Sequence, residues 1–305
     1  MTSEAEFSDI QNVSVYLQGA SVPKHVGPFA KSASHKPSRF YKDLHFRGIF
    51  SVKTTNGKFK LHHIGTTIEN ELFWKGLGSS MEDETVWLWE DFCRKSNVIL
   101  DIGANTGVYA LMAKAENPNA KVIAFEPSIK IFPRLVKNVE LNGYDIVCEK
   151  KAISNSNETQ VFYDLDALEF PTSGSLSSKK LKELTEGRTD ISEYEVICKT
   201  MDTYIEENGL KSIDLIKIDV ELHEPAVFEG FKRIQEIRPT IVVEVLNQDV
   251  ADQITAATDL TGYGIYKLVA PYKVEKLNAI IADLKYRNIL LLPTEKELPQ
   301  NTIVI

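Results

Sequence analysis

Short apolar runs alternate with amphipathic stretches through the middle of the chain. The runs VILDI, KVIAF, DIVCEKKAI, SIDLIKI and PTIVVEV predict buried strands. Between them, GVYALMAKAE, FPRLVKNVELNG and EPAVFEGFKRI have helical spacing, and Gly143 is typical of a residue that ends a helix. Strands that alternate with helices in this way predict parallel βαβ units and an α/β fold with a doubly wound sheet.

The two flanks of the chain show other patterns. Residues 1 to about 40 mix proline, serine and lysine, and we expect an arm with little regular structure there. Partly alternating runs on both sides of Asn56-Gly57 predict a β-hairpin within residues 49–65, because this dipeptide favours tight hairpin turns. Near the C-terminus, IYKLVA and NILLLP are expected to pair as a closing antiparallel hairpin at the sheet edge.

Two further features divide the chain. Ser80 with Asp83 resembles a capping box and predicts the start of a helix. Residues 164–193 are polar and break the strand–helix rhythm, so we interpret them as an insertion over the sheet. The predicted organisation is an N-terminal arm and hairpin region at 1–79, followed by a Rossmann-like domain at 80–305 that carries this insertion.

Charge limits the classes of partner. The net charge of −8 over 305 residues argues against a general nucleic-acid binder, which usually has a basic excess. The segment from Lys24 to Lys60 is an exception, with nine Lys or Arg residues and one acid. We interpret it as a solvated basic arm, and the alternative is a patch that attracts an anionic substrate or a membrane surface.

The cysteines and the apolar runs indicate the compartment. Cys93, Cys148 and Cys198 lie far apart without C-x-x-C spacing, so zinc and redox motifs are absent. The first residues lack the features of a secretory signal, and no apolar run approaches the ~20 residues that span a membrane. We therefore expect a cytoplasmic protein with reduced thiols.

The first predicted strand ends in the most specific motif. Asp101, Gly103 and Gly107 form D-x-G-x-x-x-G between a strand and a helix, where glycines allow a tight turn and a close approach of ligand. This is neither the G-x-G-x-x-G dinucleotide fingerprint nor a P-loop, since no Gly-Lys-Ser/Thr follows. A carboxylate beside the glycines repels a pyrophosphate and suits a positive group such as the amine of a methionine moiety.

A second acid follows at the end of the next strand. Glu126 lies 19 residues after Gly107, where an ionised carboxylate offers two acceptor oxygens to the two ribose hydroxyls. Asp101 and Glu126 together therefore fit a nucleoside with a cationic amino-acid tail, which is S-adenosylmethionine.

Several motifs in this order resemble one known family. DIGANTGVYAL, FEPSIKIFPRLVKNVELNG, IDLIKIDVE and RPTIVVEV, within about Glu82 to Pro293, are similar to the FkbM family of S-adenosylmethionine-dependent methyltransferases. The resemblance implies a class I Rossmann-like fold with a seven-stranded sheet whose last strand is antiparallel. It also implies O-methylation of a hydroxyl on a small-molecule acceptor such as a sugar or natural product.

The resemblance also implies a cofactor site. The glycine-loop residues line the methionine part, Glu126 and Pro127 meet the ribose, two residues after the third strand flank adenine, and an acid at a helix start closes the site. Asn138 and Asn142 match the family pattern too, and we assign them structural roles, with Asn142-Gly143 as a helix stop. The implied cofactor-binding residues are Glu82, Asp101, Gly103, Ala104, Asn105, Gly107, Glu126, Pro127, Ala152, Ile153 and Asp219.

The stretch IKIDVELHEP holds the catalytic candidates. Ligands of open α/β sheets bind at the carboxyl ends of the strands, which is where Asp219 and Glu221 are expected. Glu221 or His223 can take the proton from the acceptor hydroxyl. We favour Glu221, because the family usually has D-V-E-G-A-E here, with small residues at the positions of Leu222 and His223. Glu224 is expected only to begin a helix.

Two alternatives stay open. Asp219, Glu221 and Glu244 can offer oxygen ligands to Mg²⁺ or Ca²⁺, a minority interpretation because EVLNQD lacks the adjacent Asp-Asn pair of metal-dependent enzymes with this fold. Leu222 and His223 also suggest a catalytically inactive cofactor-binding or interaction module, since larger side chains can close an acceptor site. The main hypothesis remains an S-adenosylmethionine-dependent O-methyltransferase.

Overall fold

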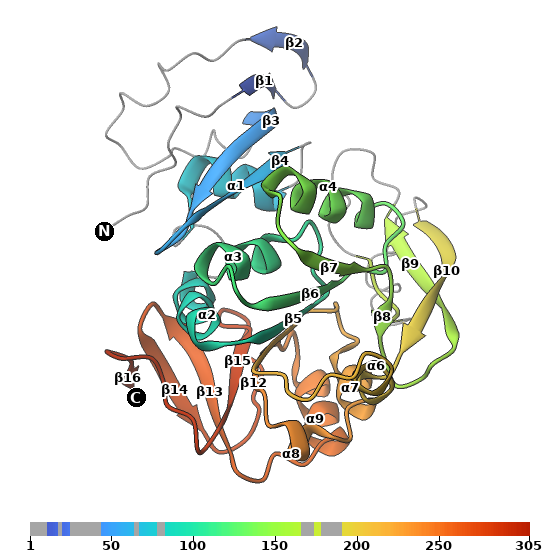
Figure 1. Ribbon diagram of the computed structural model, residues 1–305, viewed down its shortest axis with the longest axis vertical. Helices are drawn as coiled ribbons and strands as arrows, with labels where there is room; N and C mark the ends of the chain where they lie inside the picture. Colours follow the sequence, from blue (N-terminus) through green and yellow to red (C-terminus); the bar gives the residue numbers. More distant parts are fainter. Residues whose placement is uncertain are drawn as a thin grey trace.

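The computed structural model describes residues 11–17, 20–24, 44–63, 67–77, 83–165, 174–177 and 191–305. A large central sheet lies between two layers of helices (Figure 1). Its strands follow the order β16-β14-β13-β15-β12-β11-β5-β6-β7. None of the helices in the described ranges is long and apolar enough to cross a membrane.

The middle of the central sheet is parallel. β5 (Val98–Ile102), β6 (Lys121–Phe125), β7 (Ile146–Glu149), β11 (Leu215–Ile218) and β12 (Thr240–Glu244) run in one direction. β15 (Asn288–Pro293) is antiparallel to both β12 and β13 (Tyr263–Ala270). This confirms the doubly wound sheet with an antiparallel last strand, while β14 (Lys273–Leu277) and β16 (Ile303–Val304) widen it to nine strands.

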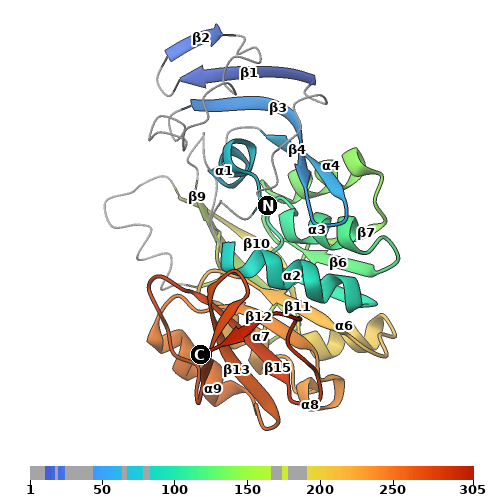
Figure 2. The same ribbon diagram turned by 90° about the vertical axis from the view of Figure 1, so that its left-hand side faces the viewer.

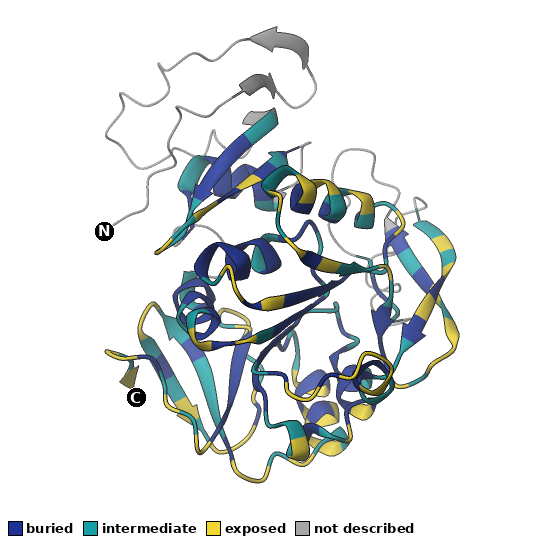
Figure 3. Ribbon diagram, in the orientation of Figure 1, coloured by how far each residue is buried: buried dark blue, intermediate teal, exposed yellow. Residues whose placement is uncertain are grey.

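Each face of the central sheet has its own apolar core. Side chains alternate along β5, so that Ile99 packs into one core and Leu100 into the other. Figures 2 and 3 show the layers and the buried sheet between them. One face packs against α2 (Asp83–Lys95), α3 (Val108–Glu116) and α4 (Phe132–Asn142), and the other against α6 (Met201–Glu207), α7 (Glu224–Glu229), α8 (Ile234–Ile237) and α9 (Gln248–Ala257).

Three predicted elements differ from the structure. The run DIVCEKKAI is divided into β7 and β8 (Ala152–Ile153), and β8 leaves the central sheet to pair with β10 (Ile191–Lys199). The helix predicted over EPAVFEGFKRI ends early, since α7 stops at Glu229 and α8 begins only at Ile234, the last residue of that run. The C-terminal pair β13 and β15 is confirmed as antiparallel, but β14 lies between them in the chain and pairs with the other side of β13, so they form no hairpin.

The N-terminal region contains a second sheet, of order β2-β1-β3-β4 (Figure 1). β3 (Leu44–Lys53) and β4 (Lys58–His63) form the predicted hairpin. β1 (Gln11–Leu17) and β2 (Ala20–Lys24) pair beside β3, so the expectation of little regular structure is wrong for these two segments. The predicted cap Ser80 lies outside the described residues, and α2 begins at Asp83. The predicted boundary near residue 79 stays a prediction.

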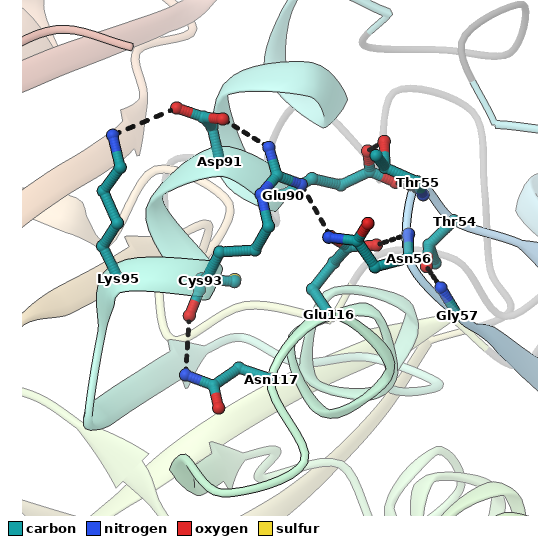
Figure 4. A network of polar contacts seen from close by, with 11 residues as sticks. Thr54, Thr55, Asn56, Gly57, Glu90, Asp91, Cys93, Lys95, Glu116 and Asn117 are labelled. Carbon is teal, nitrogen blue, oxygen red and sulfur yellow. Dashed lines mark hydrogen bonds and ion pairs between the residues drawn. The ribbon is translucent and has the colours of Figure 1, made fainter.

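Hydrogen bonds join the turn of this hairpin to α2 and α3 (Figure 4). The Asn56 N–H donates to Glu116 Oε1 at 2.7 Å, and Arg94 donates to Glu116 Oε2 at 2.6 Å. Thr55 donates to Glu90 through both its backbone N–H and its hydroxyl. At Gly57 an added Cβ would lie 2.4 Å from the Ala115 carbonyl oxygen, so the turn approaches α3 more closely than a side chain permits.

Two asparagines of α4 hold β4 along its length. The Asn138 Oδ1 accepts from the His62 N–H at 2.8 Å. Asn142 accepts from the Lys60 N–H at 2.6 Å and donates to the Lys60 carbonyl at 2.8 Å, as a neighbouring strand would. The structural roles predicted for both residues are confirmed. Gly143 ends α4 at φ 64°, as predicted.

The predicted insertion begins inside a strand. β9 (Thr159–Leu165) pairs antiparallel with β10, and β8, β10 and β9 form a small third sheet. Residues 174–177 also lie against this sheet, since Ser175 and Tyr163 exchange two backbone hydrogen bonds of 2.9 and 3.0 Å. These described parts of the insertion therefore cover the carboxyl side of the central sheet.

Candidate functional site

A cavity of about 450 Å³ opens where the parallel strands end, which is a suitable size for a small-molecule site. It collects nearly all of the predicted site residues, although they come from five separate segments. Gly107 is not among the lining residues, and Glu82 lies outside the described part of the chain. The predicted residues that line the cavity are Asp101, Gly103, Ala104, Asn105, Glu126, Pro127, Ala152, Ile153, Asp219, Glu221, His223 and Glu244.

The loop after β5 is shaped by its glycines. Gly103 has φ +84°, and an added Cβ there would lie 1.8 Å from the Asp219 carbonyl oxygen. The N–H groups of Gly103 and Ala104 both donate to the Phe125 carbonyl, at 3.0 and 2.9 Å. Gly107, at φ +95°, packs against Leu135 and so shapes the loop from behind. The glycine spacing therefore builds the cavity wall and presses it against the loop after β11.

Asp101 sits at the base of this wall. Its side chain is 2% exposed, and its Oδ2 accepts from the Ala110 N–H at the start of α3, at 2.9 Å. In the parallel register Asp101 lies beside Lys217 of β11. A carboxylate fixed in this way faces the cavity next to the glycine loop, as the sequence predicts.

Glu126 directly follows β6 and contacts the glycine loop through Asn105. Its two oxygens accept from the Asn105 N–H at 2.9 Å and from the Ser128 N–H at 2.8 Å. Burial raises the pKa of Glu126 to about 7, against the lowering effect of these two hydrogen bonds. These two hydrogen bonds hold the side chain in place in the cavity lining.

Lys217 is a site residue that the sequence analysis missed. It is 1% exposed in the middle of β11, and its Nζ donates to Asp219 Oδ2 at 2.8 Å. The ammonium also lies 4.6 Å from the ring centroid of Tyr109. A lysine inside the apolar run IDLIKI was the available signal, because lysine is rarely fully buried without a partner.

The loop after β11 contains two consecutive left-handed residues that are not glycine. Glu221 has φ 55° and Leu222 has φ 70°. The Ser175 hydroxyl donates to the Glu221 carbonyl at 2.6 Å, so the inserted segment holds this loop from above. The Leu222 side chain is 8% exposed and packs into the apolar core, so it does not line the cavity.

His223 follows and lines the cavity. Its Nε2 lies 2.9 Å from the Ser154 hydroxyl, and burial lowers the pKa of His223 to about 4. The imidazole is therefore neutral at pH 7, and it is a weaker base than an ordinary histidine.

Glu224 begins α7, as predicted, and also supports the loop before it. It is fully buried, and its Oε1 accepts from the Val220 N–H at 3.0 Å. Its Oε2 has no hydrogen-bond partner among the described residues. Burial raises the pKa of Glu224 to about 8, so this side chain is largely a neutral acid at pH 7.

The geometry does not support the metal hypothesis. Asp219, Glu221 and Glu244 all line the cavity. Within the described ranges, however, neither these acids nor any other His, Cys, Asp and Glu side chains form a group of three or more suited to a metal ion.

Comparisons with known sequences agree with the motifs of this site. The model of the family described as "Methyltransferase FkbM domain" matches residues 101–287, which run from Asp101 to Arg287. The match thus covers the glycine loop, Glu126, the loop after β11 and Glu244.

Three curated proteins are similar to this chain. The chain is 28% identical to methyltransferase sdnD of Sordaria araneosa over 211 residues, which is 60% of this chain and 80% of that protein. It is 31% identical to 2-O-methyltransferase NoeI of Sinorhizobium fredii over 186 residues, or 57% of this chain and 74% of that protein. It is 24% identical to hexuronic acid methyltransferase AglP of Haloferax volcanii over 177 residues, or 57% of this chain and 66% of that protein.

Proposed function

Because the chain belongs to the FkbM methyltransferase domain family, with S-adenosylmethionine as its cofactor, we propose that it methylates a hydroxyl oxygen of a sugar or similar small molecule. One observation carries the proposal: a single cavity joins the acids that suit the cofactor, Asp101 and Glu126, to the acids that suit an acceptor, Asp219 and Glu221.

The cofactor end fits S-adenosylmethionine chemically. The buried carboxylate of Asp101 suits the amine of the methionine part, and the lone pairs of Glu126 suit the ribose hydroxyls. The buried Ala152 and Ile153 offer an apolar wall to the adenine. Because Gly103 carries no side chain, the glycine loop packs directly against the Asp219 carbonyl, which fixes this wall of the cavity.

The acceptor end is organised for proton removal. When bound, the cofactor supplies a methyl group made electrophilic by its positive sulfur. The carboxylate of Glu221 would accept the proton that the acceptor hydroxyl loses as its oxygen takes the methyl group from sulfur. Lys217 holds Asp219 toward the cavity, and the neutral His223 lines the same wall. Glu221 is favoured as the base because it carries the acid of the family pattern D-V-E-G-A-E, whereas His223 stands where that pattern has a small residue.

The relatives support an oxygen acceptor on a sugar. NoeI is named a 2-O-methyltransferase, and AglP is named a hexuronic acid methyltransferase. The alternative of an inactive module rested on Leu222 and His223. Since Leu222 packs into the core, it leaves the cavity open, and the argument for a closed acceptor site loses its main residue.

Titration calorimetry with S-adenosylhomocysteine, the demethylated product, tests the proposal. We expect binding to the unaltered chain and a loss of about tenfold in affinity for Asp101→Asn, since a charge-assisted contact is removed. Asp252→Asn, an exposed acid of α9, is the matched control and should bind normally. Glu221→Gln should bind the product normally but transfer methyl groups on the order of 100-fold more slowly. No binding by the unaltered chain contradicts the proposal.

A further inference from the structure

Arg287 differs from the other cations that line the cavity. Lys151 donates to Glu149 at 2.6 Å, and Lys217 donates to Asp219 at 2.8 Å. The guanidinium of Arg287 forms no ion pair or hydrogen bond with any residue that the structure describes. The elements around it leave this positive group available to a ligand.

The position of Arg287 is fixed even though its side chain is exposed. Its carbonyl accepts from the Val245 N–H at 2.8 Å, which places its backbone beside the carboxyl end of β12. β15 begins at the next residue, Asn288, whose register partner on β12 is Glu244. Because Glu244 and Leu246 also line the cavity, Arg287 belongs to the acceptor side rather than to the glycine loop.

Asn288 lies behind the same wall, next to Arg287 in the chain and opposite Glu244 in the register. Its side chain is 1% exposed, and within the described residues its Oδ1 has no hydrogen-bond partner. A buried polar atom without a partner costs stability, so its presence needs an explanation. Asn288 is not itself a lining residue, but it lies directly opposite Glu244, so its unsatisfied oxygen stands behind the wall that carries Glu244 and Arg287.

We propose that Arg287 and Glu244 form an acceptor subsite for a sugar acid, in which Arg287 binds the carboxylate of the acceptor. A guanidinium matches a carboxylate with two parallel hydrogen bonds, which fix orientation as well as position. Glu244 accepts from a sugar hydroxyl, and Asn288 supports that wall. This inference rests on the proposed function and narrows its substrate to acceptors that carry a carboxylate.

The test compares acids with their neutral counterparts. Protein loaded with S-adenosylhomocysteine is titrated with methyl glucuronide and methyl glucoside, then with methyl galacturonide and methyl galactoside. At least one uronide should bind about tenfold or more tightly than its neutral counterpart. Arg287→Gln should remove this preference, and Arg287→Lys should keep part of it. Lys285→Gln removes the same charge two residues away, outside the cavity lining, and should change nothing.

Several outcomes would overturn the subsite. They are equal binding of acid and neutral sugars or no binding of either, a preference that survives in Arg287→Gln, and an equal loss in Lys285→Gln. Tighter binding of glucose 6-phosphate than of either uronide would overturn the choice of a carboxylate. The titrations are repeated without S-adenosylhomocysteine. A failure of that compound to bind would therefore count against the proposed function, while the uronide preference is judged separately.

Discussion

The loops after β5 and β11 both contain left-handed backbone, but different kinds of residue adopt it. Both follow adjacent parallel strands, both line the cavity, and both need left-handed backbone. The first places that backbone largely on glycine, at Gly103 and Gly107, where it has little steric cost. The second places it on Glu221 and Leu222, at a cost of about 1–2 kcal/mol for each residue.

The difference shows where each shape comes from. The glycine loop is specified by its own residues. The loop after β11 depends on distant contacts, namely the Ser175 hydroxyl on the Glu221 carbonyl, the Glu224 carboxyl under Val220, and the burial of Leu222. A strained loop held by such contacts is typical of sites where the strain serves a function.

The largest effect is expected where the two loops touch. Gly103→Ala would place a Cβ 1.8 Å from the Asp219 carbonyl oxygen, so one loop must move. We expect loss of the folded state, or destabilisation by more than about 4 kcal/mol. Gly143→Ala also has positive φ but no atom within 4 Å of the added Cβ, and should cost only about 1 kcal/mol. Urea denaturation measures the free energy of unfolding of both variants. Equal losses of stability would show that backbone strain alone, and not the clash with Asp219, determines the effect.

A smaller effect concerns Glu126, which follows β6 and accepts a hydrogen bond from Asn105 of the glycine loop. Glu126 has a pKa raised to about 7, so between pH 6 and pH 8 its carboxyl changes from mainly protonated to mainly ionised. The ionised form is the better acceptor for ribose hydroxyls, so affinity for S-adenosylhomocysteine should rise by up to about tenfold over this range.

Two variants serve as controls for this pH dependence. Glu126→Gln should bind weakly at every pH. Glu224→Gln should keep the rise, because Glu224 has a pKa raised to about 8 but does not line the cavity. Calorimetry at three pH values measures the affinity of each protein for S-adenosylhomocysteine. An affinity that does not change with pH in the unaltered chain contradicts the role of Glu126.

The smallest effect concerns Leu222. Replacing Leu222 by glycine loses a buried side chain but relieves the left-handed strain, so we expect a net loss of only about 1–2 kcal/mol. Leu222→Ala loses most of the same burial and keeps the strain, and should therefore be less stable than Leu222→Gly. Thermal unfolding of the three proteins gives the order. A glycine variant more stable than the unaltered chain would show that burial of Leu222 contributes little.

The parts that were predictable from sequence are those encoded locally. Apolar runs, the glycine spacing and Asn56-Gly57 predicted the strands, the loop after β5 and the hairpin, because each depends on neighbours in the chain. The division of DIVCEKKAI was not predictable in this way, since it depends on the pairing of β8 with β10, more than 35 residues further along the chain. The contacts of Ser175 and the position of Arg287 likewise depend on packing between distant segments.

The contacts of the N-terminal hairpin with α2, α3 and α4 determine where this chain can be cut for expression. Phe50, Val52, Phe59 and Leu61 of the hairpin are buried in the same core as Trp89 and Leu111. A fragment that began at residue 80 would expose this apolar surface to water and remove the hydrogen bonds that the hairpin makes with Glu90, Glu116, Asn138 and Asn142. Fragments made for crystallisation should therefore retain at least β3 and β4, even though the family match begins only at Asp101.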